Sequence, residues 1–157
     1  MQKEDVKIQG FSRVKIIDPD GRVAGDSGFN GPNQITNVGF LHYLCHLLGG
    51  SAGSRQVAFV ALGTGGTSAS NATGLPGEIM SSTQRNAPTY ANVGSTTAQF
   101  TVTFASSESF LTGASNLSNI GLFNSSAENS MFAGNTFASS SCNTNQEVQA
   151  TYQIRFS

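Results

Sequence analysis

The amino-acid sequence predicts a mainly β protein with a single helix, and three features of its pattern lead to that prediction. Apolar and polar residues alternate without exception in the last segment, VQATYQIRF, from Val148 to Phe156, as expected of a half-buried strand. Earlier apolar runs are short and are separated by connectors rich in glycine, asparagine and serine, a spacing typical of a sandwich or barrel. One segment, TNVGFLHYLCHLLGG, has helical spacing instead.

The expected strands follow one another along most of the chain. The segment RVKIIDPDGRVAG places two apolar runs around Pro19–Gly21, where proline presets φ and glycine accepts a positive φ, so it predicts a hairpin. Gln56–Leu62 is apolar on both faces, and residues 99–104 alternate. Shorter strands are expected at 119–123 and 131–137, whereas the serine-rich stretch FASSSCNTNQ is expected to be a loop.

The helix is expected over about residues 37–48. Asn37 is a good N-cap, and the glycine pair at 49–50 is a good stop signal. The apolar residues between them define one face, which we expect to pack against an open end or face of the β structure. This expected face consists of Val38, Leu41, Leu44, Cys45 and Leu48, widened by Phe40 and Leu47.

Length and composition favour one globular domain over residues 1–157. Only 11% of the residues are charged and the net charge is −1, so the chain exerts no long-range attraction on nucleic acid or an anionic membrane. No apolar run approaches the roughly 20 residues of a membrane span. The charged start MQKEDVKIQG lacks the apolar region of a secretory signal, so we expect synthesis in the cytoplasm. Cys45 and Cys142 are expected to be separate thiols.

The glycine-rich stretch ALGTGGTSAS, residues 61–70, raises the question of a phosphate-binding loop. A P-loop needs a lysine that reaches the terminal phosphates, and no lysine follows Lys15. A dinucleotide-binding fingerprint needs a third glycine, where Ser68 stands, and a following helix, which Pro76 and Gly77 disfavour. We therefore interpret the stretch as a surface turn after a buried strand.

Other catalytic patterns are incomplete as well. The segment GGSAG at 49–53 matches the hydrolase pattern G-x-S-x-G, but a helix precedes it and a strand follows, the reverse of a nucleophile elbow. His42 and His46 could form one edge of a zinc site, yet the chain has no third histidine. The segment DPDG lacks the further oxygen ligands of a calcium loop. We therefore expect no enzyme activity, no cofactor and no metal.

One ion pair can be predicted from charge spacing. Glu78 and Arg85 are the only opposite charges in a long neutral stretch. We expect them to pair across the loop that follows Glu78.

An ordered set of short motifs resembles small structural proteins of tailed-bacteriophage virions, the group that contains capsid decoration (cement) proteins and tail- or fibre-associated proteins. The motifs are NQITNVGFLHYL, ALGTGG, LPGEI followed by Arg85, IGLFN and MFAGNTF, and they span the chain from about Asn33 to its end. One departure is Asn119, where an acidic residue commonly precedes the isoleucine and glycine. The matching framework consists of Asn37, Gly39, Gly63, Gly65, Leu75, Glu78, Ile79, Arg85, Gly121, Leu122 and Phe123.

The resemblance implies an antiparallel β-sandwich of jelly-roll-like form and a non-enzymatic capsid decoration protein. Such a protein would bind the phage major capsid protein and copies of itself on the virion surface, with no nucleic acid, membrane or small-molecule partner. Residues 1–12 would then be an N-terminal arm whose Lys3, Lys7 and Phe11 contact a neighbouring subunit. The alternative for this segment is a frayed start followed by an ordinary edge strand.

Two other functions stay open at this point. A tail, collar or fibre-anchoring component of the same virion would share most of these features. A glycan-binding β module is a third possibility, but the chain has no tryptophan, and most of its Phe and Tyr residues fall on inward positions, where they cannot form a stacking platform.

Overall fold

The computed structural model describes residues 6–45, 48–49, 56–79, 85–127 and 130–157. Within these ranges, hydrogen-bonded strands follow the order β4-β7-β8-β3-β1-β9-β6-β5, and β2 lies beside β1. In chain order the elements are β1 (Ile8–Ile17), β2 (Val23–Asp26), β3 (Asn30–Ile35), the π-helix η1 (Gly39–Cys45), β4 (Phe59–Gly63), β5 (Thr89–Val93), β6 (Thr97–Phe104), the 3₁₀ helix η2 (Ser106–Glu108), β7 (Ser115–Phe123), β8 (Met131–Cys142) and β9 (Glu147–Phe156).

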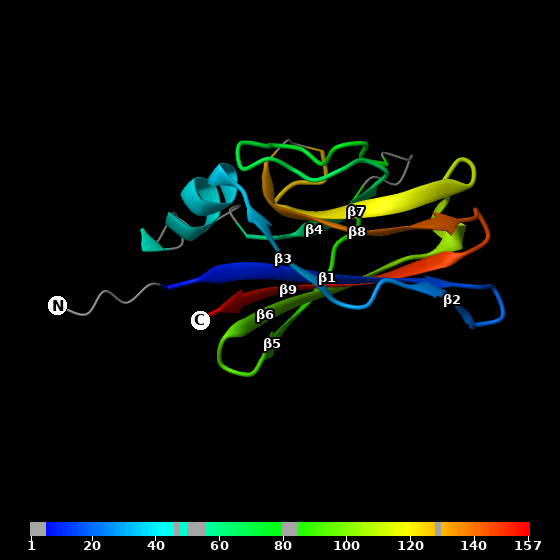
Figure 1. Ribbon diagram of the computed structural model, residues 1–157, viewed down its shortest axis with the longest axis horizontal. Helices are drawn as coiled ribbons and strands as arrows, with labels where there is room; N and C mark the ends of the chain where they lie inside the picture. The colour runs from blue at the N-terminus through cyan, green and yellow to red at the C-terminus, as the bar shows by residue number, and fades with distance from the viewer. Residues whose placement is uncertain (1–5, 46–47, 50–55, 80–84, 128–129) are drawn as a thin grey trace.

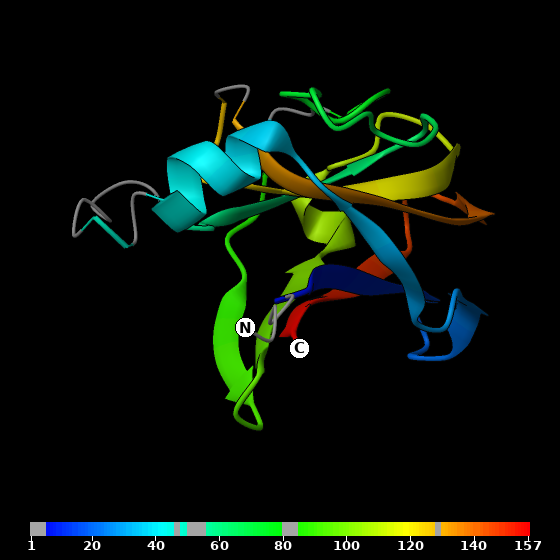
Figure 2. The same cartoon turned by 60° about the vertical axis from the view of Figure 1, so that its left-hand side comes forward.

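The strands form two layers that face each other (Figures 1 and 2). One layer contains β4, β7 and β8, and the other contains β1, β9, β6 and β5. Strand β3 joins them along one side, because it pairs with β1 through Asn33 opposite Gly10 and with β8 through Gln34 opposite Gly134. The predicted antiparallel β-sandwich with one short helix is confirmed, and the jelly-roll-like form stays a prediction.

The core lies between the two layers. Every second residue of β9 is buried from Val148 to Ile154, which confirms the period-two pattern of this segment. Burying a side chain of this kind contributes about 1.5–3 kcal/mol relative to leaving it exposed. The opposite layer contributes the fully buried side chains Leu117, Ile120 and Leu122.

The N-cap of the helix lies one residue before the expected cap, and part of the buried face differs from the expected one. The Thr36 hydroxyl oxygen accepts the N–H of Gly39 at 2.9 Å, so Thr36, and not Asn37, is the N-cap. Tyr43 is 5% exposed, whereas Leu41 is 58% and Leu48 89% exposed. The expected apolar face is therefore wrong for Leu41 and Leu48, whereas Val38 and Leu44 pack against the main core as expected. Leu47 lies outside the described residues.

The π conformation explains this shift of the buried face. Hydrogen bonds in a π-helix reach the fifth residue instead of the fourth, so residues are spaced differently around the axis than in an α-helix. Gly39 faces β8 so closely that a Cβ there would lie 2.3 Å from the Phe132 carbonyl oxygen. Within the helix, Phe40, which is 45% exposed, Leu41 and Cys45 are thus left exposed to solvent.

Strand β8 is longer than the sequence predicts. It extends to Cys142, and its serine-rich end pairs with β7 through Ser140 opposite Leu117 and Cys142 opposite Ser115. Phe137 is 7% exposed and Cys142 is fully buried. The loop expected for FASSSCNTNQ is therefore wrong over its first part, because backbone pairing holds a strand whose outward residues are serines.

The expected N-terminal arm is wrong for residues 8–12. These residues belong to β1, which pairs with β9 along its whole length, from Ile8 opposite Phe156 to Ile17 opposite Glu147. Since β1 also has β3 and β2 on its other side, the alternative of an edge strand is wrong too. Residues 1–5 of the expected arm lie outside the described residues.

Candidate functional site

Most framework residues of the motif set lie in or beneath a cap, formed by the described residues 64–79 and 85–86, on the outer face of the β4–β7–β8 layer. A small second core lies there, formed by Ala61, Leu75, Phe123 and Met131, which are all at most 6% exposed. Gly121 fits beneath Leu75 and Phe123, because a Cβ at this position would lie 3.0 Å from the Phe123 ring. The cap is therefore packed onto the sheet by apolar contacts.

The glycine-rich turn serves close backbone packing in this cap. A Cβ on Gly65 would lie 2.3 Å from the Pro76 carbonyl oxygen, so only glycine fits. Asn119 of β7 donates its amide to the carbonyl oxygens of Gly66 at 3.1 Å and Pro76 at 2.8 Å. An acidic side chain in place of Asn119 would have no N–H to donate, which gives a physical reason for the departure from the motif at this position.

A buried ion pair ties the cap to the sheet, as the charge spacing predicts. The Arg85 guanidinium, whose side chain is 1% exposed, donates to both carboxylate oxygens of Glu78, at 2.6 and 3.0 Å. It also donates to the Ser125 carbonyl oxygen at 2.9 Å and lies 3.5 Å from the centroid of the Phe123 ring. The bidentate hydrogen bonds to Glu78 and the contact with the Phe123 ring compensate the buried charge of Arg85.

The cap also covers the outer edge of β4 and reaches the start of the helix. Gly63 pairs with Glu78, and Val60 pairs with Asn86, in isolated β-bridges. The Ile79 N–H donates to the Leu62 carbonyl oxygen at 2.8 Å. The Asn37 N–H donates to the Ser70 carbonyl oxygen at 2.7 Å. Together with Leu122 of β7, which is fully buried in the main core, the framework residues thus form one connected unit.

The opposite end of the strand path, β5, has no such cover among the described residues. All five of its residues, TYANV, are exposed, and none carries a charge. Its described pairing is with β6 on one side only. Proteins usually shorten, charge or cover an edge strand, because its free N–H and C=O groups can pair with another chain. Strand β2, by comparison, has only four residues and ends at Asp26.

An apolar groove of about 440 Å³ lies beside this edge, between the two layers. Its floor includes Phe100 of β6, Phe132 of β8 and Phe156 of β9, while Tyr43 and Leu44 come from η1 and Tyr90 from β5. The hairpin β5–β6 extends away from the opposite layer (Figure 2), and Tyr90 is 57% exposed. The open edge and the groove form a continuous surface, hereafter the β5 surface.

Of the three residues expected to contact a neighbouring subunit, the structure describes Lys7 and Phe11. Lys3 lies outside the described residues. Lys7 is exposed, and its backbone pairs with Ser157 at 2.7 and 2.9 Å. Phe11 lies on the outer face of β1, half-buried under the Arg155 guanidinium at 4.0 Å. The β5 surface was missed, because short neutral strands leave no strong pattern in a sequence.

The described titratable groups provide little chemistry. Burial raises the pKa of the Cys142 thiol to about 11 and the pKa of the Tyr152 hydroxyl well above its usual value, so both stay protonated at neutral pH. Within the described ranges, no three His, Cys, Asp or Glu residues gather around one metal position, and no helix is long and apolar enough to cross a membrane. The His42 side chain, His46 and residues 50–53 of the hydrolase-like pattern lie outside what the structure describes.

Comparison of the chain with protein-family models, with curated proteins and with solved structures finds no significant match.

Proposed function

We propose that the chain is a non-enzymatic structural protein of a bacteriophage virion, of the capsid decoration (cement) type, which binds the assembled head as an oligomer. Support comes from the ordered motif set, whose residues meet in the packed cap over β4, β7 and β8. The β5 surface adds a neutral, partly apolar area of the kind that protein partners cover. A tail or collar component is the alternative within the same particle.

The single observation that carries the assembly role is the contrast between the two ends of the strand path. The edge of β4 is covered by the chain's own residues at Gly63 and Val60, whereas the edge of β5 is left uncharged and uncovered by described residues. Extended backbone is the one partner that matches a free strand edge. We assign that partner to β5 of a second copy.

The sequence of β5 suits such a symmetric pairing. In an antiparallel pair centred on Ala91, each Tyr90 would lie opposite Asn92 and each Thr89 opposite Val93, and no like charges would meet. Tyr90 contacts inward-facing Phe100, with ring centroids 5.6 Å apart. Alternate residues of the paired strands would therefore extend the apolar groove from one copy into the next.

The pairing can be tested by the mass of the protein in solution. Size-exclusion chromatography with light scattering should give a dimer or a multiple of it for the native chain. Ala91→Lys should shift it to monomer, because two lysines would meet at the centre of the pair. Thr103→Lys, at an exposed position on β6 that lies opposite Gln149 of β9 and beyond the end of β5, is the matched control and should stay dimeric. A monomeric native chain, or a dimeric Ala91→Lys variant, contradicts the pairing.

Location within the particle tests the virion role itself. In purified particles of a phage that encodes the chain, antibody labelling viewed by electron microscopy should mark the head surface at many positions. Labelling at the tail or collar instead would favour the alternative. Particles without the protein, or turnover of a small molecule by the purified chain, would contradict a structural role.

A further inference from the structure

An exposed phenylalanine is held in a fixed position on the outer face of the β1–β9–β6 layer. Phe29 lies in the connection between β2 and β3 and is 46% exposed. Most aromatic side chains of the described residues are buried, and Phe29 is among the few that are exposed, with Phe40 and Tyr90. An exposed aromatic ring on a rigid support is the feature that sugar-binding β modules need and that the sequence pattern did not reveal.

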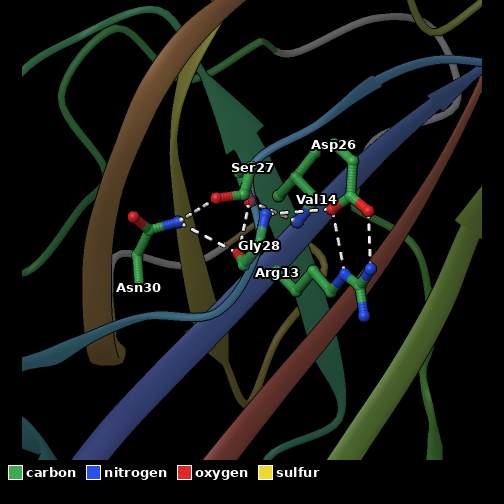
Figure 3. Close-up of polar contacts among 6 residues, drawn as sticks. All are labelled: Arg13, Val14, Asp26, Ser27, Gly28 and Asn30. Atoms are coloured by element: carbon green, nitrogen blue, oxygen red, sulfur yellow. Dashed lines mark hydrogen bonds and ion pairs between the residues drawn. The ribbon is translucent and has the colours of Figure 1, made fainter.

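Hydrogen bonds fix the connection that carries Phe29 (Figure 3). The Ser27 hydroxyl accepts the Val14 N–H at 2.9 Å and donates to the Gly28 carbonyl oxygen at 2.8 Å. Asn30 donates its amide to the carbonyl oxygens of Ser27 and Gly28, at 3.3 and 3.1 Å. Asp26 accepts the Gly28 N–H at 2.9 Å. The backbone on both sides of Phe29 is therefore tied to β1 and to itself.

Two guanidinium groups flank the ring. Arg13 lies 6.0 Å and Arg155 5.8 Å from its centroid. Arg13 is held by both carboxylate oxygens of Asp26, at 2.9 and 2.5 Å (Figure 3). Arg155 is held by the carbonyl oxygen of the Gln153 side chain, at 3.0 and 2.7 Å. Gln153 is itself 8% exposed and donates to Gln99 at 2.7 Å, so the whole arrangement is preorganised.

A shallow polar pocket of about 310 Å³ lies next to this ring. Besides Arg13, Phe29 and Gln153, it is lined by Lys15, Gln99, Gln149 and Thr151. Two carboxylates contact residues of this lining, since Asp26 pairs with Arg13 and Glu147 accepts from the Gln149 amide at 2.9 Å. Lys15 has no ion pair among the described residues. The pocket therefore offers a cation, amide and hydroxyl groups, and an aromatic face at once.

We propose that this pocket binds a carboxylated sugar, a hexuronic acid or a sialic acid, at the end or along the chain of an oligosaccharide. The apolar face of the pyranose ring stacks on Phe29, the carboxylate lies on the Lys15 ammonium group, and the hydroxyls bond to Thr151 and Gln149. The volume is at the lower end of the range for small-ligand sites, which is about 300–1,000 Å³. A hydroxyl- and amide-rich lining of this size fits a sugar ring better than an acidic peptide.

Binding to defined oligosaccharides tests the proposal, which does not depend on the virion role. The probes are a sialylated trisaccharide, a galacturonic acid trisaccharide, the neutral counterpart of each, and a polyglutamate peptide, measured by titration calorimetry. One of the acidic sugars should bind at least about tenfold more tightly than its neutral counterpart, a ratio that corresponds to about 1.4 kcal/mol. Equal binding of the neutral sugar, or no binding of either acid, overturns the proposal.

Variants separate stacking from charge. Phe29→Ala should reduce affinity about tenfold for acidic and neutral forms alike, whereas Lys15→Gln should remove only the preference for the acid. Phe40→Ala, at another exposed aromatic outside the pocket, and Lys7→Gln, at an exposed lysine outside the pocket, are the controls and should bind as the native chain does. Unchanged affinity of Phe29→Ala in a folded variant overturns the proposal. Tighter binding of polyglutamate than of both sugars would do the same and identify a docking face for acidic protein.

Discussion

Replacing Glu78 by glutamine would remove the charge that compensates a buried guanidinium. The Arg85 side chain is 1% exposed and the Glu78 side chain 10% exposed, so water cannot replace the lost carboxylate. Breaking one partner of a buried pair costs about 3–5 kcal/mol. Since glutamine keeps one oxygen that can accept from Arg85, we expect the lower end of this range, about 3 kcal/mol.

Thermal and urea unfolding measure this change directly. In a chain of this size, 1 kcal/mol corresponds to a shift in Tm of about 2–4 °C, so Glu78→Gln should lower Tm by roughly 6–12 °C. Asp20→Asn is the matched control, because it makes the same chemical change in the exposed pair with Arg22, where the side chains are 59% and 77% exposed. Exposed pairs contribute about 0–1 kcal/mol, so the control should unfold close to the native chain.

Repeating the substitution in an Arg85→Met variant shows whether the loss of stability comes from the uncompensated Arg85 charge. In Arg85→Met, Glu78→Gln should cost almost nothing or even stabilise the chain, because the carboxylate no longer has a cation to balance. If Glu78→Gln unfolds at the same temperature as Asp20→Asn, the reasoning is refuted. The cap would then be held by its apolar contacts alone.

Three further outcomes are expected. Cys45 is exposed and Cys142 buried, so one thiol should react with Ellman's reagent in the native chain and a second only after unfolding; two fast thiols would refute the burial of Cys142. Asn119→Asp should lower the free energy of unfolding by about 2–4 kcal/mol in urea, because it removes two donated hydrogen bonds and buries a carboxylate beside carbonyl oxygens; an unchanged midpoint would contradict this geometry. Hydrogen bonds and charge from Arg13 lower the pKa of Asp26 well below its usual range, so their stabilisation is complete above roughly pH 4 and is lost as the pH falls; Asp26→Asn should flatten the Tm profile between pH 4 and 2.

The sequence predicted those features whose cause is local or strictly periodic. Apolar residues alternate from Val148 to Ile154 because one face of this strand packs against the core, and every second residue is buried as predicted. The pairing of Glu78 with Arg85 followed from their isolation in a neutral stretch. The two-residue periodicity of β6 was equally clear, and Phe100, Val102 and Phe104 are buried as predicted.

Features that depend on distant contacts could not be predicted. The helix turns its Gly39 side to β8 because of a contact with the Phe132 backbone, and periodicity cannot show such a contact. The serine-rich end of β8 is a strand because β7 supplies backbone partners. Phe29 belongs to no periodic pattern in the sequence, and only the hydrogen bonds of Ser27 and Asn30 make it a fixed platform.

The cap over β4 also limits how far copies of the chain can add to one another. A sheet with two free ends can grow without limit into a filament, because each added copy presents a fresh end. Here Glu78 and Asn86 already occupy one end, so edge-to-edge addition through β5 would close after two copies. With β4 occupied, the proposed pairing through β5 would give a closed, symmetric dimer and would not continue into a fibre.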